Sequence, residues 1–194
     1  MQPQPTPWMV ESAYRYLMAA KHLQYCRNML PIAQINAALG MEILLKSFLS
    51  RPNGNLGQAN QTYELDKGAI NEAHERLKAA DRIPEERKNN KFGDRHDLLT
   101  LFHAIPEPIR QRVGLDRREK NIEKDRDIFT NARYQYERGA AKGFNDILIG
   151  VLDELIENVV HWYRELGCKD TFIVFYGVQP LELPPDPDPE PETL

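Results

Sequence analysis

The sequence predicts an all-α protein, an up-and-down bundle of about four to six helices. Three long segments carry this prediction, because their apolar residues recur every three or four positions: residues 8–28, 31–50 and 144–166. That spacing places the apolar side chains on one face of a helix, where they can be buried. Prolines also stand where the first two of these helices begin or end, as expected for a residue that cannot continue a helix.

The first two helices have clear boundary signals. Thr6 and Pro7 form a typical helix start, a capping residue followed by proline at the first helical position. Pro31 opens the second helix, and Pro52 lies beyond its end. Apolar residues cover most of the circumference of this second helix, so we expect it to be the central and most buried one.

The middle of the chain predicts shorter elements. Residues 51–64 and 82–94 have the composition of loops, and a polar, partly exposed helix is expected over residues 68–80 between them. Asp94 is expected to cap a helix over residues 95–105, because prolines follow that segment directly.

The next two segments are less apolar. Residues 109–113 predict a short helix that Gly114 closes. Residues 115–127 alternate positive and negative charges, which is typical of a solvated helix face or a mobile connection.

The C-terminal part predicts three different kinds of structure. The long amphipathic helix of residues 144–166 ends at Gly167 and completes a bundle spanning residues 1–169. TFIVFYGV, residues 171–178, is rich in β-branched and aromatic residues, so residues 170–180 are expected to form an extended apolar arm. The arm would pack on the bundle or pair with a second copy of the chain. Residues 181–194 are acidic and proline-rich, which predicts a disordered tail.

Composition excludes several classes of protein. The only two cysteines, Cys26 and Cys168, predict free thiols in a reducing cytoplasm rather than disulfides or a cysteine zinc site. The first residues lack the pattern of a secretory signal, and no apolar run is long enough to span a membrane. The formal net charge is −4, but without the five acids of residues 181–194 the chain has 25 basic and 24 acidic residues. Charge alone therefore indicates no particular partner.

No motif for a cofactor or a metal is present, so we expect neither. Glu42 and Lys46 stand four positions apart on the second helix and predict a structural ion pair, with one charge lining a cleft as the alternative. His96 and Asp97 are expected in the first turn of their helix, where capping is the simpler interpretation and catalysis the alternative. His103 is expected to be a partly buried packing residue.

FTNARYQYERG, residues 129–139, gathers many groups that can form hydrogen bonds or stack. Two arginines could hold phosphate while an aromatic ring stacks on a base. The candidate RNA- or nucleotide-binding residues are therefore Arg133, Tyr134, Tyr136, Glu137 and Arg138, together with His96 and Asp97.

Three pieces of the sequence, taken in this order, resemble the HEPN superfamily (higher eukaryotes and prokaryotes nucleotide-binding). They are AALGMEILLKSFL (37–49), RHDLLTLFHAIP (95–106) and IFTNARYQYE (128–137). The resemblance implies a helical bundle that often forms a homodimer. Many members are metal-independent ribonucleases of toxin–antitoxin and other defence systems, while others bind RNA or a protein partner without catalysis.

Active members of that family carry an arginine followed, after four to six residues, by a histidine near the start of the last helix. After Arg133 those positions hold Arg138, Gly139 and Ala140. The only pair with this spacing, Arg15 and His22, belongs to the first helix.

The missing histidine shapes the functional prediction. The expected function is a non-catalytic module that binds RNA, a nucleotide or a protein partner. A metal-independent ribonuclease using a set such as Arg133, Glu137 and His96 or His103 is one alternative, and a homodimeric structural protein is the other.

Overall fold

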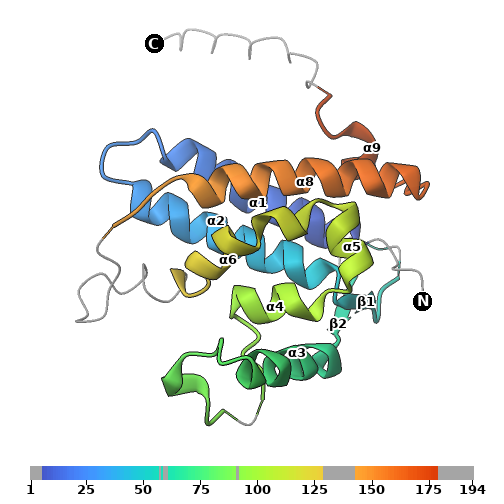
Figure 1. Cartoon of the computed structure of the whole chain (residues 1–194). Helices are drawn as coiled ribbons and strands as arrows, with labels where there is room; N and C mark the ends of the chain where they lie inside the picture. The colour runs from blue at the N-terminus through green and yellow to red at the C-terminus, as the bar shows by residue number, and fades with distance from the viewer. Residues whose placement is uncertain (1–5, 57, 59–60, 91, 129–142, 179–194) are drawn as a thin grey trace, which may run out of the picture.

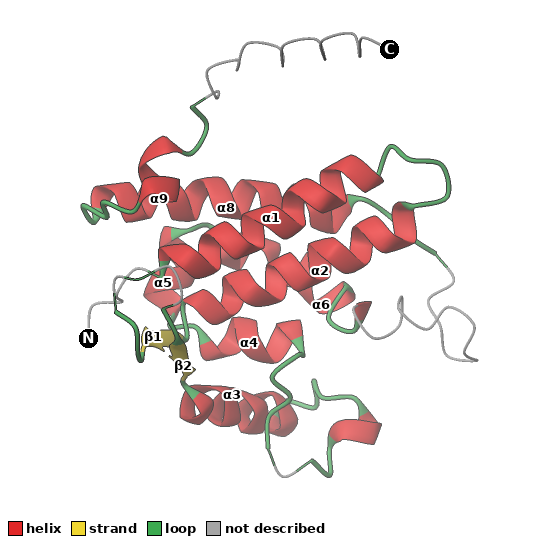
Figure 2. Ribbon diagram, turned by 180° about the vertical axis from the view of Figure 1, so that it is seen from behind, coloured by secondary structure: helices red, strands yellow, loops and turns green. Residues whose placement is uncertain are grey.

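The structure is a computed structural model that describes residues 6–178 except residues 57, 59–60, 91 and 129–142. Most described residues are helical (Figures 1 and 2), in agreement with the predicted all-α class, but they form eight α-helices rather than the four to six expected. The helices are α1 (Pro7–Leu23), α2 (Leu30–Ser47), α3 (Lys67–Ala79), α4 (Leu98–Ala104), α5 (Glu107–Arg112), α6 (Glu119–Lys124), α8 (Ile147–Glu165) and α9 (Thr171–Phe175). Two 3₁₀ turns, η1 (Glu85–Arg87) and η2 (Leu115–Arg118), and two short strands, β1 (Ser50–Pro52) and β2 (Tyr63–Leu65), complete them.

Helices α1, α2 and α8 lie side by side and bury the main core (Figure 1). Gly40 of α2 marks the place where they meet. A Cβ atom at this position would lie 2.6 Å from Leu152 Cδ2 of α8 and 3.1 Å from the carbonyl oxygen of Ala13 in α1. The small residues of α2 therefore allow both neighbouring helices to approach closely.

The N-terminus of α1 is tied to this core. Thr6 is fully buried, and its hydroxyl donates to the carbonyl oxygen of Ser47 over 2.9 Å. The amide of Thr6 donates to the hydroxyl of Tyr163, at 3.3 Å. These bonds join the start of α1 to the ends of α2 and α8 and so satisfy polar groups that burial would otherwise destabilise.

The two strands form a small antiparallel ladder in which Ser50 pairs with Leu65 and Pro52 with Tyr63. Sequence composition predicted a loop here. Each strand has only three residues, which is too short for an alternation of apolar and polar residues to be visible. The ladder leads the chain from α2 to α3, which packs against α4.

Helix α4 begins later than predicted. Asp97, rather than Asp94, is its N-cap and accepts a hydrogen bond from the amide of Leu99 at 3.3 Å. Asp94 instead accepts from the amide of His96, at 2.9 Å, in the turn before the helix. His96 and Asp97 therefore precede the first helical turn, contrary to the prediction, but Asp97 does cap the helix, as the simpler interpretation expected.

The prediction of an extended arm was also wrong for the residues that form α9. Asp170 caps this short helix by accepting from the amides of Phe172 and Ile173. Ile173 is fully buried in the same core as α1 and α8. Burial and capping outweigh the strand propensity of these residues, and α9 packs against its own chain. Residues 179–194, with the predicted acidic tail, lie outside the described residues.

Two further findings concern only the described part of the chain. None of its helices combines the length and hydrophobicity needed to cross a membrane. Within the same residues, no group of three or more histidine, cysteine or acidic side chains is arranged to hold a metal ion.

Candidate functional site

The candidate site lies where α2 approaches the start of α4. Glu42 and Lys46 are four positions apart on α2, and Lys46 Nζ lies 2.6 Å from Glu42 Oε1. Both side chains are largely buried, with 8% of Glu42 and 18% of Lys46 exposed. The pair fixes a carboxylate near the surface of an otherwise apolar helix.

His96 completes this cluster from the turn before α4. Its Nδ1 lies 3.0 Å from the same Glu42 Oε1, and 63% of the imidazole is exposed. A carboxylate accepts hydrogen bonds, so in the neutral imidazole Nδ1 would carry the proton and Nε2 would be left as an acceptor. No described residue forms a hydrogen bond with Nε2. A buried carboxylate thus orients an exposed imidazole, an arrangement suited to a general base.

Further polar atoms on α2 are buried without partners. Gln34 stands eight positions before Glu42, two steps of four along the helix, and is only 1% exposed. Within the described part of the chain, neither of its amide atoms, nor Oε2 of Glu42, has a hydrogen-bond partner. Packing alone does not favour such residues, because each unpaired polar group costs about 1–3 kcal/mol. Gln34 thus places a further polar side chain on α2, closer to the start of the helix than Glu42 and Lys46.

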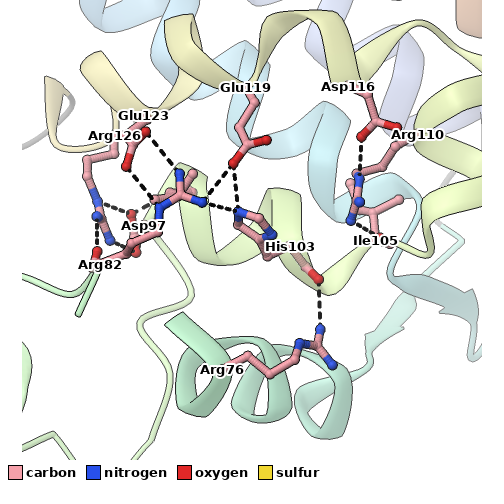
Figure 3. Close-up of polar contacts among 11 residues, drawn as sticks. Arg76, Arg82, Asp97, His103, Ile105, Arg110, Asp116, Glu119, Glu123 and Arg126 are labelled. Atoms are coloured by element: carbon pink, nitrogen blue, oxygen red, sulfur yellow. Dashed lines mark hydrogen bonds and ion pairs between the residues drawn. The ribbon is translucent and has the colours of Figure 1, made fainter. Parts of the chain in front are cut away.

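Asp97, by contrast, is a structural anchor. Its side chain is almost fully buried, and both of its oxygens accept hydrogen bonds from Arg126, at 2.9 and 2.5 Å. It also accepts from the hydroxyl of Thr100 and from the amide of Leu99. Arg126 in turn donates to the carbonyl oxygen of Arg82 (Figure 3). With these bonds Asp97 has little capacity left for a ligand.

The polar network continues from Arg82 across α4 to α6, as Figure 3 shows. The guanidinium of Arg82 forms ion pairs with Glu119 and Glu123, each at 2.9 Å. His103 Nε2 lies 3.1 Å from the same Glu119 oxygen. Arg76 of α3 donates to the carbonyl oxygen of His103, over 3.0 Å. These bonds hold α3, α4 and α6 together.

Burial and neighbouring charges shift the pKa values of two residues in this network, His103 and Glu119. Desolvation lowers the pKa of His103, and the nearby Arg82 and Arg110 act in the same direction, which outweighs the opposing attraction of Glu119. Burial alone would raise the pKa of Glu119, but the hydrogen bond from Arg82 and the nearby His103 lower it. Because its pKa is lowered, His103 is an uncharged imidazole at neutral pH, and its Nε2 lies between Glu119 Oε1, at 3.1 Å, and the guanidinium of Arg82, at 3.3 Å.

A hydrogen bond joins the first two of the three sequence pieces that carry the family resemblance. Glu42 belongs to the first piece and His96 to the second, and their side chains are hydrogen-bonded. The third piece begins at Ile128, which is 8% exposed and packs in the core. Arg126, two residues earlier, reaches Asp97 of the second piece.

The remaining predicted residues, Arg133, Tyr134, Tyr136, Glu137 and Arg138, lie outside the described residues. Arg15 pairs with Glu11 on its own helix and forms no hydrogen bond with His22. Sequence reasoning missed Gln34 and Arg126. Arg126 sits among alternating charges that give it no distinguishing signal, while Gln34 could have been noticed as a polar residue within an apolar helix.

A pocket of about 630 Å³ lies elsewhere, between the start of α1, the residues before β2 and α9, and is lined by none of Glu42, Lys46 or His96. Comparisons with protein-family models, with curated proteins and with solved structures found no match.

Proposed function

We propose that this chain is a non-catalytic, HEPN-like module that binds RNA at the surface around the start of α4. The main support is the hydrogen bond between Glu42 and His96, which joins two of the three pieces on which the family resemblance rests. Arg95, next to His96, is exposed and has no carboxylate within 4 Å among the described residues. It offers a cation for a phosphate group at this surface.

The test is fluorescence anisotropy with labelled single-stranded RNA at low and high salt. We expect binding at low salt that weakens as salt rises, because cations that contact phosphates release counterions. The variant Arg95→Ala should make the slope of log K against log salt shallower by about 0.7, the value for one phosphate contact on a single strand. The matched variant Arg117→Ala removes an exposed cation on another element and should leave the slope unchanged. No binding at low salt, or equal losses in both variants, would refute the proposal.

A second candidate function, a metal-independent ribonuclease, is favoured by the geometry of His96. Glu42 would orient the imidazole, and Nε2 would remove the proton of a ribose 2′-hydroxyl. The resulting oxygen would attack the adjacent phosphorus, and the departing 5′-oxygen would take up a proton, leaving a cyclic phosphate.

Incubation of labelled RNA with the protein in EDTA separates the two candidates. Cleavage that falls at least about a hundredfold in His96→Asn would indicate general-base catalysis. The control is His161→Asn, which changes an exposed histidine of a different element, α8. This variant should retain full activity. RNA that stays intact while binding persists would support the non-catalytic module.

We also propose a homodimer, as the family resemblance implies. The third alternative, a structural protein that dimerises through its C-terminal arm, has less support because α9 buries Ile173 in its own chain. Light scattering would measure the mass of the full chain and of a chain without residues 179–194. A dimer that persists in the shorter chain agrees with the proposal, and a monomeric full chain contradicts it.

A further inference from the structure

The pocket of about 630 Å³ beside α9 has the size of a small-molecule site, for which about 300–1,000 Å³ is typical. Its walls come from three parts of the chain: the start of α1, residues 58, 61 and 63 before and within β2, and residues 170–172 and 175–178. What distinguishes it is its aromatic lining, to which these residues contribute: Trp8, Tyr14, Tyr63, Phe172, Phe175 and Tyr176.

Three of these rings form a compact cluster. The ring centroids of Tyr14 and Phe172 lie 5.4 Å apart, those of Tyr14 and Tyr176 5.4 Å, and those of Phe172 and Tyr176 5.6 Å. The planes are tilted or nearly perpendicular, at 48°, 73° and 76°. Faces of aromatic rings carry partial negative charge and attract cations. A cluster with differently oriented rings can present such faces on more than one side of a ligand.

The charged groups of the pocket are all acidic. Glu11 and Asp170 belong to its lining, and no lysine, arginine or histidine among the described residues does. Asp170 uses Oδ1 to cap α9, and no described residue donates to Oδ2. Burial, and then the nearby carboxylates of Glu157 and Asp153, raise the pKa of Tyr176 to about 12. Burial also raises the pKa of Tyr63, with a further contribution from Asp170.

A cation of the protein itself already uses two of these groups. The guanidinium of Arg15 stacks on the Trp8 ring, 5.5 Å from its centroid, and pairs with Glu11 Oε1 over 2.7 Å. This contact lies at the edge of the pocket and is exposed, with 64% of the Arg15 side chain accessible. It demonstrates that the ring and the carboxylate are spaced to hold a positive group together.

The wall that includes Phe175 and Tyr176 is held in place. Arg164 of α8 donates to the carbonyl oxygens of Ile173, Val174 and Tyr176, at 2.8, 3.1 and 2.7 Å. The opposite wall begins at Pro7, directly after the buried and hydrogen-bonded Thr6. Both walls are therefore attached to the core, which reduces the ordering that ligand binding would require.

We propose that this pocket binds a small organic cation, such as an ammonium or guanidinium head group, between its aromatic rings and the carboxylates of Glu11 and Asp170. The proposal is independent of the RNA-binding function, because the pocket shares no lining residue with the site at Glu42 and His96.

Fluorescence of Trp8 provides the test. The chain has two tryptophans, so Trp162→Phe leaves Trp8 as the only reporter, and circular dichroism checks that this variant is folded. The probes are choline chloride, agmatine and 3,3-dimethylbutan-1-ol, the neutral isostere of choline, at constant ionic strength. We expect a saturable change in Trp8 emission with choline or agmatine at a concentration at least tenfold lower than with the neutral alcohol.

Variants in the same background identify the groups responsible. Glu11→Gln and Asp170→Asn should each weaken cation binding several-fold, and the asparagine can still cap α9. Phe175→Leu changes an exposed ring and should weaken binding of the cation but not of the alcohol. Glu75→Gln removes a carboxylate on the exposed face of α3 and is the control. Equal response to choline and alcohol, no response to either cation, or equal effects of Glu75→Gln and Asp170→Asn would overturn the proposal.

Discussion

At the scale of single residues, similar polar side chains have different roles because their surroundings differ. His96 and Asp97 are neighbours in sequence, and both were expected to take part in one site. Asp97 is buried and satisfied by Arg126, whereas His96 is exposed and held by Glu42. Their neighbours in the fold decide this difference, and those neighbours come from α2 and from the segment after α6, which the local sequence does not reveal.

The pair of Asp97 and Arg126 leads to a prediction about stability. Only 1% of the Asp97 side chain and 10% of the Arg126 side chain are exposed. Arg126→Met should therefore lower the free energy of unfolding by about 3 kcal/mol, because it leaves a buried carboxylate without its counter-ion. Urea denaturation measures this change.

An exposed ion pair supplies the matched control. Arg112 and Glu165 are also paired, but their side chains are 51% and 41% exposed. Arg112→Met should change the free energy of unfolding by less than about 1 kcal/mol. If both variants lose the same stability, Asp97 is not anchored as described.

His103 makes a prediction about pH. Burial lowers its pKa below the ordinary value of 6.5, so the unfolded chain binds the proton more strongly than the folded chain. Its contribution to stability is complete above that value and is lost as pH falls below it. NMR titration should show a midpoint for His103 below that of a blocked histidine peptide.

The same shift should appear in urea denaturation. Between about pH 7 and pH 5 the wild-type protein should lose more stability than His103→Gln, because only the wild type can bind the proton at this position. A window above pH 5 keeps this effect apart from Glu119, whose lowered pKa matters only in more acidic solution. Identical pH profiles of the two proteins would contradict the assignment.

At the scale of elements, sequence periodicity predicted the long helices well and the short elements poorly. Helices α1, α2 and α8 each have at least seventeen residues, enough for an apolar stripe to repeat. Helix α9 has five residues, so its β-branched and aromatic composition suggested a strand. Helical structure there depends on the cap from Asp170 and on the burial of Ile173, and neither is visible in a pattern of hydrophobicity.

Two adjacent residues of α9 test its packing. Ile173 is fully buried, whereas Val174 is 41% exposed. Ile173→Ala should lower the free energy of unfolding by about 2–4 kcal/mol, because it leaves a cavity in the main core. Val174→Ala should cost less than about 1 kcal/mol by urea denaturation. An extended arm detached from the core would give two small and similar values.

At the scale of the whole molecule, one core joins elements from both ends of the described chain. It includes Val10 of α1, Leu152 of α8 and Ile173 of α9. The candidate site and the aromatic pocket are built on this shared framework, although their residues come from different elements. The sequence predicted the main core helices and the ion pair of Glu42 and Lys46 within one helix. It did not reveal the contact of Glu42 with His96 or the aromatic cluster, since each depends on segments that meet only after folding.

Gly40, where α1, α2 and α8 meet, tests this framework. Gly40→Ala should lower the free energy of unfolding by about 1–3 kcal/mol, because the added methyl group would press against the fully buried Leu152 and the backbone of Ala13. Gly150→Ala is the matched control, since a methyl group there on α8 meets no atom within 4 Å. It should instead stabilise the protein by up to about 1 kcal/mol through the higher helix propensity of alanine. Urea denaturation of both variants should therefore give changes of opposite sign, and a stabilising Gly40→Ala would show that the three helices do not approach each other as closely as described.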